Sequence, residues 1–281
     1  METEILLEKI NKSFGSVRAL EEVTLCIEKG LTTAIVGDNG SGKSTLIKIL
    51  SGNLRPDSGS ITVGGRRWSR LGIAQALRLG IRTVYQDLSL DNCKNSYENV
   101  FLGCERMRGC FLDRAAMRRE TEALLRRLEI HIPDLELPVR FLSGGQRQGL
   151  AIARALRTPG SVLLLDEPTA AMGIRESHQT LELLKRLRAE GVTQVLVSHN
   201  IFQVFDAADR IYVMRSGKMV ADVMTKSSSP EQLHALILAQ ENREVAGGKK
   251  NIPAMPPFGS WWASACVWRR LSACEPTIFS A

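Results

Sequence analysis

The run Gly37–Thr45, which reads Gly-Asp-Asn-Gly-Ser-Gly-Lys-Ser-Thr, constrains the fold of this chain more than any other feature. It fits the pattern GxxxxGK[ST] completely and lies between an apolar segment, residues 32–36, and a helical pattern, residues 44–50. Glycines let the backbone curl so that successive N–H groups point inward, and the helix that follows offers further free N–H groups. We therefore predict a strand, a loop and a helix that together hold the phosphates of a nucleoside triphosphate.

Two residues of this loop have specific expected roles. Lys43 supplies a mobile cation to the β and γ phosphates, and the Ser44 hydroxyl is a ligand for Mg²⁺, which prefers oxygen. The alternative is a glycine-rich turn with a chance lysine, which the flanking strand and helix disfavour. The expected nucleotide-binding residues are Gly37, Asp38, Asn39, Gly40, Ser41, Gly42, Lys43, Ser44 and Thr45.

A second signal is the apolar segment 162–165, which ends in two acids, Asp166 and Glu167. A strand buried on both faces delivers its last residues to the edge of the sheet where phosphates sit. Asp166 is placed to hold magnesium, and Glu167 is placed to orient and polarise the attacking water. The alternative is that both acids are solvated turn residues.

The third signal is Leu142-Ser143-Gly144-Gly145-Gln146, in which Ser143 precedes Asp166 by 23 residues. With this signature the chain, over about residues 3–240, resembles the ATPase domain of the ABC transporter superfamily. The resemblance implies an α/β fold: a P-loop NTPase core with a mostly parallel sheet, an antiparallel β edge sheet, and an inserted α-helical subdomain at about 87–144. It also implies a head-to-tail dimer in which the signature contacts the γ phosphate held by the opposite protomer. The implied signature contacts are Ser143, Gly144, Gly145 and Gln146.

Three further positions match the family by resemblance. Gln86, 43 residues after Lys43, matches the glutamine that contacts magnesium and water. His199 matches the histidine that contacts the γ phosphate, although a lone histidine is more often structural. Phe14 matches the aromatic residue that stacks on adenine, and a plain core phenylalanine is the alternative. The resemblance thus implies Glu167, His199 and Gln86 as catalytic residues, and Ser44, Gln86 and Asp166 as the magnesium ligands.

One position departs from the family. After Pro168 the family usually has a segment ending in an aspartate at the dimer interface, and this chain has Gly173 there. That glycine variant, together with the stretches 86–88 and 98–103, resembles the sugar-importer branch. Many sugar ATPases carry two cassettes on one chain, whereas this sequence has one phosphate loop and one signature. It therefore resembles the single-cassette members.

The periodicity of the rest of the chain predicts alternating strands and helices, hence a mostly parallel sheet covered on both faces. Residues 96–130 are helical in period, with Asp113 as the expected N-cap of a helix ending near Ile130. The ATPase domain is expected over 1–240, followed by a poorly ordered tail, 241–281. A partner-docking segment and a shifted reading frame remain alternatives for that tail. The other expected strands lie in 3–29, 61–63, 81–85, 195–197 and 211–214, and the other expected helices at 145–156, 175–189 and 201–207.

Composition excludes several classes. The formal net charge is +7 and the pI about 9.3, but without a compact Lys/Arg block a solvated basic face is favoured over a nucleic-acid tail. None of the six cysteines forms a CxxC pair, which argues against zinc and for reduced thiols in the cytosol. No apolar run approaches the ~20 residues of a membrane helix, so if the protein serves a membrane, we expect it to do so as a peripheral subunit.

The sequence therefore predicts an ATPase that uses ATP and Mg²⁺ to power import of a solute. Its resemblance to the sugar-importer branch indicates that the solute is a sugar. Expected partners are transmembrane permease subunits, a second ATPase protomer and, indirectly, a solute-binding protein, without nucleic acid. The expected location is the cytoplasmic face of the inner membrane. A soluble ATPase of the same superfamily acting on nucleic acid or ribosomes, and a P-loop kinase, remain the rival hypotheses. Export in place of import, and a heterodimer in place of a homodimer, also stay open.

Overall fold

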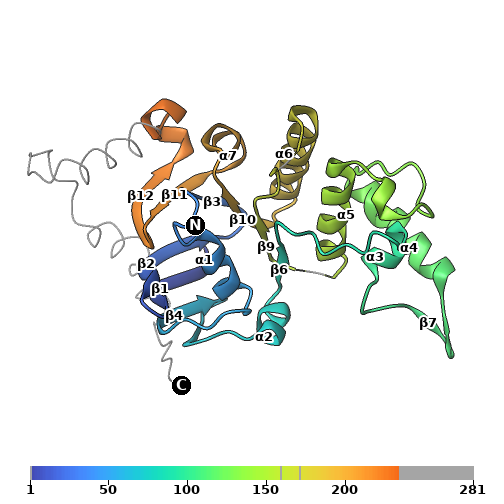
Figure 1. Cartoon of the computed structure of the whole chain (residues 1–281), viewed down its shortest axis with the longest axis horizontal. Helices are drawn as coiled ribbons and strands as arrows, with labels where there is room; N and C mark the ends of the chain where they lie inside the picture. The colour runs from blue at the N-terminus through green and yellow to red at the C-terminus, as the bar shows by residue number, and fades with distance from the viewer. Residues whose placement is uncertain (1, 159, 171, 234–281) are drawn as a thin grey trace, which may run out of the picture. The chain divides into compact units, whose positions relative to one another are not determined.

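The computed structural model describes residues 2–158, 160–170 and 172–233 (Figure 1). All that follows concerns these residues, which fall in a first unit, Met1–Leu236. The expected tail 241–281 lies outside the described residues.

A six-stranded sheet forms the centre of this unit, in the strand order β12-β11-β3-β10-β9-β6. All neighbours pair in parallel except β11 and β12. The strands β3, β9 and β10 are buried along their whole length, because their apolar residues face covering layers on both sides of the sheet. The strands are β3 (Thr32–Val36), β6 (Ile81–Val84), β9 (Val162–Asp166), β10 (Thr193–Ser198), β11 (Arg210–Arg215) and β12 (Lys218–Met224).

A second, antiparallel sheet has the order β2-β1-β4-β5. Its first two strands are long and turn at Gly15, whose φ of +58° a glycine adopts without strain. The Tyr212 hydroxyl of β11 lies 3.2 Å from both the amide nitrogen and the carbonyl oxygen of Cys26 in β2, so the two sheets share a buried polar contact. The strands are β1 (Thr3–Phe14), β2 (Val17–Glu28), β4 (Ser58–Val63) and β5 (Arg66–Trp68).

Helices connect the parallel strands. Helix α1 (Lys43–Leu50) follows β3 directly, α5 (Gly144–Leu156) precedes β9, and α6 (Ile174–Ala189) follows it. The shorter helices are α2 (Ile73–Arg78), α7 (Ile201–Ala207) and the 3₁₀ turn η2 (Thr225–Ser227). The predicted fold class, a P-loop α/β core with an antiparallel sheet, is confirmed. Helix α2 and strand β12 were not among the predicted elements.

The inserted segment between β6 and α5 contains α3 (Ser96–Val100), α4 (Arg114–Arg127) and the 3₁₀ turn η1 (Val139–Phe141). The helical period predicted over 96–130 is wrong in its middle, where β7 (Met107–Arg108) and β8 (Phe111–Leu112) form a small hairpin. Gly109 makes the turn of this hairpin with φ +63°. Asp113 caps α4 as predicted, since its side chain accepts a hydrogen bond from the Ala116 amide at 2.8 Å.

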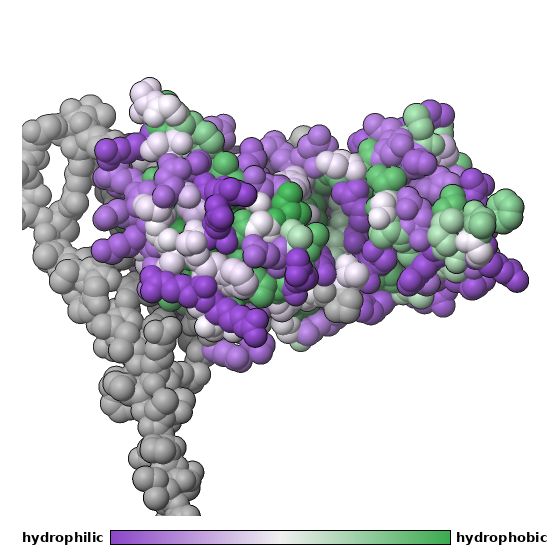
Figure 2. All heavy atoms as spheres, turned by 90° about the horizontal axis from the view of Figure 1, so that it is seen from below, coloured by the Kyte–Doolittle hydropathy of each residue, from purple (hydrophilic) through white to green (hydrophobic). Residues whose placement is uncertain are grey.

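The hairpin β7–β8 exposes apolar side chains. Met107 is 57% and Phe111 79% exposed, and Figure 2 shows apolar surface at the end of the view that carries this hairpin. None of the helices in the described ranges has the length and hydropathy needed to cross a bilayer.

Asn99 organises the loop that leads into α3. It is fully buried, its Oδ1 accepts from the Asp91 amide at 2.8 Å, and its Nδ2 donates to the carbonyls of Asp91, Lys94 and Asn95. We predict that Asn99→Ala lowers the free energy of unfolding by about 1–3 kcal/mol, because buried backbone groups lose their partners. Urea unfolding measures this, with the exposed Asn92→Ala as control. Equal stability of the two variants would contradict the assignment.

Candidate active site

The loop between β3 and α1 needs glycine at two positions. Gly37 has φ +156°, and a Cβ there would lie 2.0 Å from the Met214 carbonyl oxygen of β11. Gly42 has φ +106°, and a Cβ there would lie 2.4 Å from the Ala19 carbonyl oxygen of β2. The curl of the loop therefore depends on close approach to two neighbouring strands, which no larger residue permits.

Lys43 lies inside this curl and is only 5% exposed. Its Nζ donates to the carbonyl oxygens of Gly37 at 2.6 Å and Asp38 at 2.8 Å. Burial lowers the pKa of the Lys43 amine, while the charges of Glu167, Asp38 and Asp166 act in the opposite direction. The loop thus holds a buried amine whose desolvation the charges of the surrounding acids partly offset.

The beginning of α1 is suited to an anion. The N-cap is Gly42, which offers no side-chain acceptor, and the first turn of the helix has no acidic residue. The first-turn N–H groups, including those of Ser44 and Thr45, have no acceptor within the helix. Together with the helix dipole they form an electropositive end beside the Lys43 amine.

Asp166 ends β9 beside this helix. It is 6% exposed, and its Oδ1 lies 3.5 Å from the Ser44 hydroxyl. Burial raises the pKa of the Asp166 carboxyl, and the neighbouring Glu167 charge adds to that shift, whereas Ser44 and Lys43 oppose it. A carboxylate and a hydroxyl oxygen this close form a donor set of the kind that Mg²⁺ prefers.

Glu167 and His199 form a pair at the same edge of the sheet. The Glu167 backbone is left-handed, with φ +52°, and its amide donates to the Val197 carbonyl of β10 at 2.9 Å. That conformation turns the side chain toward the end of β10, where Glu167 Oε2 lies 2.8 Å from His199 Nδ1. The side chain of Glu167 is 13% exposed and that of His199 59%, so the pair is open to an incoming ligand from the histidine side.

Two other predicted residues are exposed at the surface. Gln86 is exposed and follows β6, which ends at Val84, two residues earlier than Gln86 itself. Because β6 pairs in parallel with β9, Val84 opposite Leu165, Gln86 leaves the sheet beside Asp166. Phe14 ends β1 and is 50% exposed, with Lys12 Nζ 5.6 Å from its ring centroid, so it is a surface aromatic residue and not part of the core.

The signature begins α5. Ser143 is the N-cap: its Oγ accepts from the Gln146 amide at 3.3 Å, and its own amide donates to Gln146 Oε1 at 2.9 Å. Gln146 Nε2 also donates to the His131 carbonyl. Within the described part of the chain no hydrogen bond joins the signature to the loop 37–45, and Figure 1 shows α5 and α1 apart, with β6 and β9 between them. The N-termini of α1 and α5, each of the kind that binds anions in proteins, are therefore separate sites within one chain.

Two residues that touch these segments were missed from the sequence. Glu176 of α6 packs on the signature glycines, since a Cβ on Gly144 would lie 3.2 Å from Glu176 Oε2. The signal available was an acid in the first turn of a helix, three residues after Gly173. Arg154 of α5 donates to the carbonyls that follow Gln86. Long-range contacts of this kind have no periodic sequence signal.

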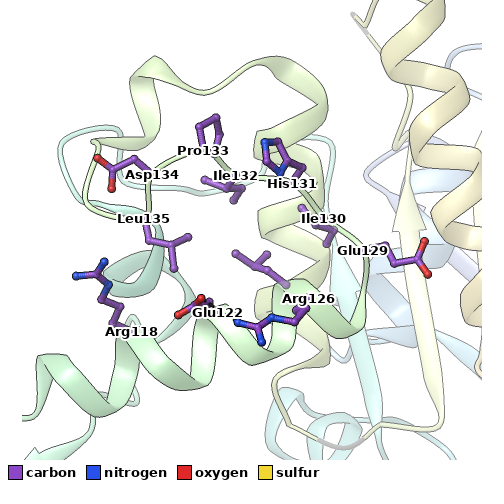
Figure 3. A pocket seen from close by; sticks show the side chains of 11 residues that line it. Arg118, Glu122, Arg126, Glu129, Ile130, His131, Ile132, Pro133, Asp134 and Leu135 are labelled. Atoms are coloured by element: carbon purple, nitrogen blue, oxygen red, sulfur yellow. Dashed lines mark hydrogen bonds and ion pairs between the residues drawn. The ribbon is translucent and has the colours of Figure 1, made fainter.

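A groove of about 480 Å³ lies on the helical insertion, between α4 and residues 130–135 (Figure 3). Leu125 and Ile130 contribute apolar walls, and Arg118, Glu122 and Arg126 line it as well. The Arg126–Glu122 ion pair, at 2.9 Å, neutralises charge within the lining. The groove contains none of the predicted site residues.

The chain is similar to one protein family and to several proteins of known role. A family model described as ABC transporter matches residues 20–170. The xylose/arabinose import ATP-binding protein of Sulfolobus acidocaldarius is 40% identical over 244 residues, which cover 87% of this chain and 97% of that protein. The fructose import ATP-binding protein of Rhizobium meliloti is 41% identical, over 76% of this chain and 86% of that protein. The ribose import ATP-binding protein of Yersinia pestis is 37% identical over 88% of this chain, which spans 48% of that protein.

Solved structures of ATP-binding cassettes are similar to this chain as well. An ATP-binding cassette of an ABC transporter in its ADP conformation is 26% identical, with a TM-score of 0.74, over 89% of this chain and 100% of that one. A dimeric, post-hydrolysis ATP-binding cassette bound to ADP and phosphate is 27% identical, with a TM-score of 0.68, over 80% of this chain and 100% of that one.

The fold and the phosphate loop define a nucleotide-binding α/β protein with a P-loop. The chain belongs to the ABC transporter family, as one of its ATP-binding cassettes. It is an ATPase of that family, and the resemblance inferred from the signature is confirmed.

The buried Asp166 carboxylate costs stability when no ligand is bound. Because burial raises its pKa in the folded protein, stability falls as pH rises through that pKa. We predict that Asp166→Asn raises the Tm of the ligand-free protein at pH 7, by roughly 2–4 °C for each kcal/mol relieved, and abolishes hydrolysis. The Tm difference should shrink on acidification toward the ordinary carboxyl pKa. Calorimetry without nucleotide or Mg²⁺ measures it, with the exposed Glu190→Gln as control. A lower Tm for Asp166→Asn at pH 7 contradicts the prediction.

Proposed function

We propose that this chain hydrolyses ATP to drive import of a sugar through separate membrane-spanning permease subunits. The observation that carries this proposal is the convergence of Lys43, the Ser44–Asp166 oxygen pair and the Glu167–His199 pair on one edge of the sheet. The sugar-import names of the relatives support the cargo class. The corresponding location is peripheral, at the cytoplasmic face of the cell membrane.

In the proposed reaction, ATP and water give ADP and phosphate. The amides of the loop 37–45 and the Lys43 amine bind the phosphates. Glu167 accepts a hydrogen bond from the attacking water and orients it toward the γ phosphorus. His199 holds the Glu167 carboxylate through Nδ1 and has its other ring nitrogen free to meet a γ-phosphate oxygen. Phe14, exposed at the end of β1, is proposed to stack on the adenine ring.

A magnesium ion fits the residues at this edge. Ser44 and Asp166 present hard oxygen donors, and a divalent cation would stabilise the Asp166 carboxylate that burial disfavours. These two residues, with Gln86, are proposed to hold it. Bound there, Mg²⁺ supplies positive charge that offsets charge on the β and γ phosphates.

The second anion-type site, Ser143–Gln146, is proposed to act on the partner. Since it lies away from the loop 37–45 of its own chain, it completes the ATP site of a second copy in a head-to-tail dimer. Gly173 lies exposed at the N-cap of α6 and has no side chain to place at the dimer interface. Glu176, three residues later, packs on the signature glycines and is proposed to offer a carboxylate there.

We predict that Glu167→Gln lowers Mg²⁺-dependent ATP turnover by roughly 10²-fold or more, because the carboxamide keeps the shape but cannot accept a proton. Phosphate release from the purified protein, alone and with its permease, measures this. Glu190→Gln, at the exposed C-cap of α6, is the control and keeps wild-type turnover. Unchanged turnover in Glu167→Gln would remove Glu167 from the mechanism.

The Glu167→Gln protein also allows a test of ATP-dependent dimerisation. Because it binds ATP without cleaving it, the closed dimer accumulates, and we predict a dimer on size exclusion with ATP and Mg²⁺ and a monomer without nucleotide. The same protein carrying Ser143→Arg in addition should remain monomeric. A Glu167→Gln protein that stays monomeric with ATP even when its permease is present argues against the shared site.

A further inference from the structure

Arg154 joins the last turn of α5 to the loop that carries Gln86. Its Nη1 donates to the Ser89 carbonyl at 2.7 Å, and its Nη2 donates to the Leu88 carbonyl at 2.5 Å. The two acceptors come 65 and 66 residues earlier in the chain. A planar guanidinium that donates to two carbonyls at once fixes both the distance and the orientation of the loop relative to the helix. A single hydrogen bond does not.

The backbone conformation of the loop after Gln86 allows both carbonyls to accept from Arg154. Ser89 has φ +48°, a left-handed conformation that a non-glycine residue adopts only where its surroundings impose it. The Asp87 side chain supports the turn by accepting from the Ser89 amide at 2.9 Å. In an extended chain successive carbonyls point to opposite sides, so the turn at Ser89 is what lets both carbonyls reach one guanidinium.

Burial of the Arg154 guanidinium has a desolvation cost. Arg154 is half-buried, burial lowers the pKa of its guanidinium, and both of these acceptors are neutral carbonyls. Arginines of the insertion, such as Arg106 and Arg118, lie instead at the surface and pair with carboxylates. Two charge-assisted hydrogen bonds offset part of this cost, and their paired geometry fixes the position of the loop relative to α5.

The far part of the loop is anchored independently. Asn99 binds the backbone of Asp91, Lys94 and Asn95, and with Arg154 on Leu88 and Ser89 the segment 88–95 is held at both ends. Only residues 85–87 remain between this anchored segment and the end of β6. The position of Gln86 is therefore set by β6 on one side and by Arg154 on the other.

We propose that Arg154 is a positioning residue that transmits movement of the signature helix to Gln86. Helix α5 starts at the Ser143 cap and carries Arg154 near its other end, so one rigid element of 13 residues, about 20 Å, spans from the signature to the loop. A shift of Ser143 on contact with a partner's nucleotide then displaces Leu88 and Ser89, and with them Gln86. This inference rests on the proposed role of Gln86 in hydrolysis.

A double-mutant cycle on the full-length protein tests it. Arg154→Gln is expected to lower kcat roughly 10- to 100-fold, as for a misplaced catalytic group, with the Kd for ATP within about twofold of wild type. Arg154→Lys, which reaches one carbonyl, is expected to retain intermediate turnover. If Arg154 acts through Gln86, then Arg154→Gln in a Gln86→Ala background gives no further loss. Independent, multiplying losses would overturn the proposal.

A second readout does not depend on activity. Amide hydrogen exchange over residues 86–91 should accelerate in Arg154→Gln and, less strongly, in Arg154→Lys. The control is Arg157→Gln at the same helix end, whose guanidinium lies over the Phe101 ring at 5.0 Å, and it should leave this exchange and kcat unchanged. Unchanged exchange in both Arg154 variants would overturn the proposal even where Arg154→Gln folds poorly. Absence of Mg²⁺-dependent hydrolysis in the wild type would instead overturn the proposed function.

Discussion

The burial of the Lys43 ammonium inside its own loop is the constraint on which the site depends. A cation that is 5% exposed must be hydrogen-bonded, and the carbonyls of Gly37 and Asp38 accept from it only because the loop curls tightly. That curl brings Gly37 against β11 and Gly42 against β2. The phosphate loop is therefore a product of the whole strand arrangement around β3, and not a local turn that folds by itself.

The same edge of the sheet holds other unfavourable features. Asp166 is a buried carboxylate with a raised pKa, and Glu167 adopts a left-handed backbone that the pairing of β9 with β10 imposes. Each costs stability in the ligand-free protein, and in the proposed mechanism each is offset by a phosphate, a cation or a water molecule that belongs to the reaction. In that proposal the free energy of nucleotide binding is coupled to relief of this local cost, which gives hydrolysis a way to reopen the site.

Local sequence patterns predict those parts of the fold that follow from local chemistry. The glycine-rich loop before α1, the apolar strand ending at Asp166 and the Asp113 cap of α4 all have a signal within a few residues, and they appear at the predicted places. The hairpin at 107–112 was missed because strands of two residues have no detectable period. Helix α2 and the antiparallel strand β12 are short or only partly buried, which weakens the hydrophobic pattern that identifies an element.

The candidate site likewise has parts that a local motif predicts and parts that it does not. Lys43, Ser44, Asp166 and Glu167 were identified by motif, and the structure brings their side chains to one edge. The contacts of Glu176 with the signature and of Arg154 with the loop after Gln86 come from packing between segments distant in the chain, for which a single sequence has no pattern. The resemblance had already implied that the signature acts on the opposite protomer, and in the structure α5 lies apart from α1 of its own chain.

That separation supports the proposal that two chains are needed for one complete ATP site, and subunit mixing tests this most directly. Lys43→Ala removes the phosphate-binding amine, Ser143→Arg blocks the signature, and each pure variant should be inactive. In a mixed dimer one of the two sites combines an intact loop with an intact signature. Mixing the two inactive proteins with the permease should therefore restore ATP hydrolysis, to about a quarter of wild-type turnover at equal amounts if the two sites act independently. A mixture as inactive as its components would contradict the shared site.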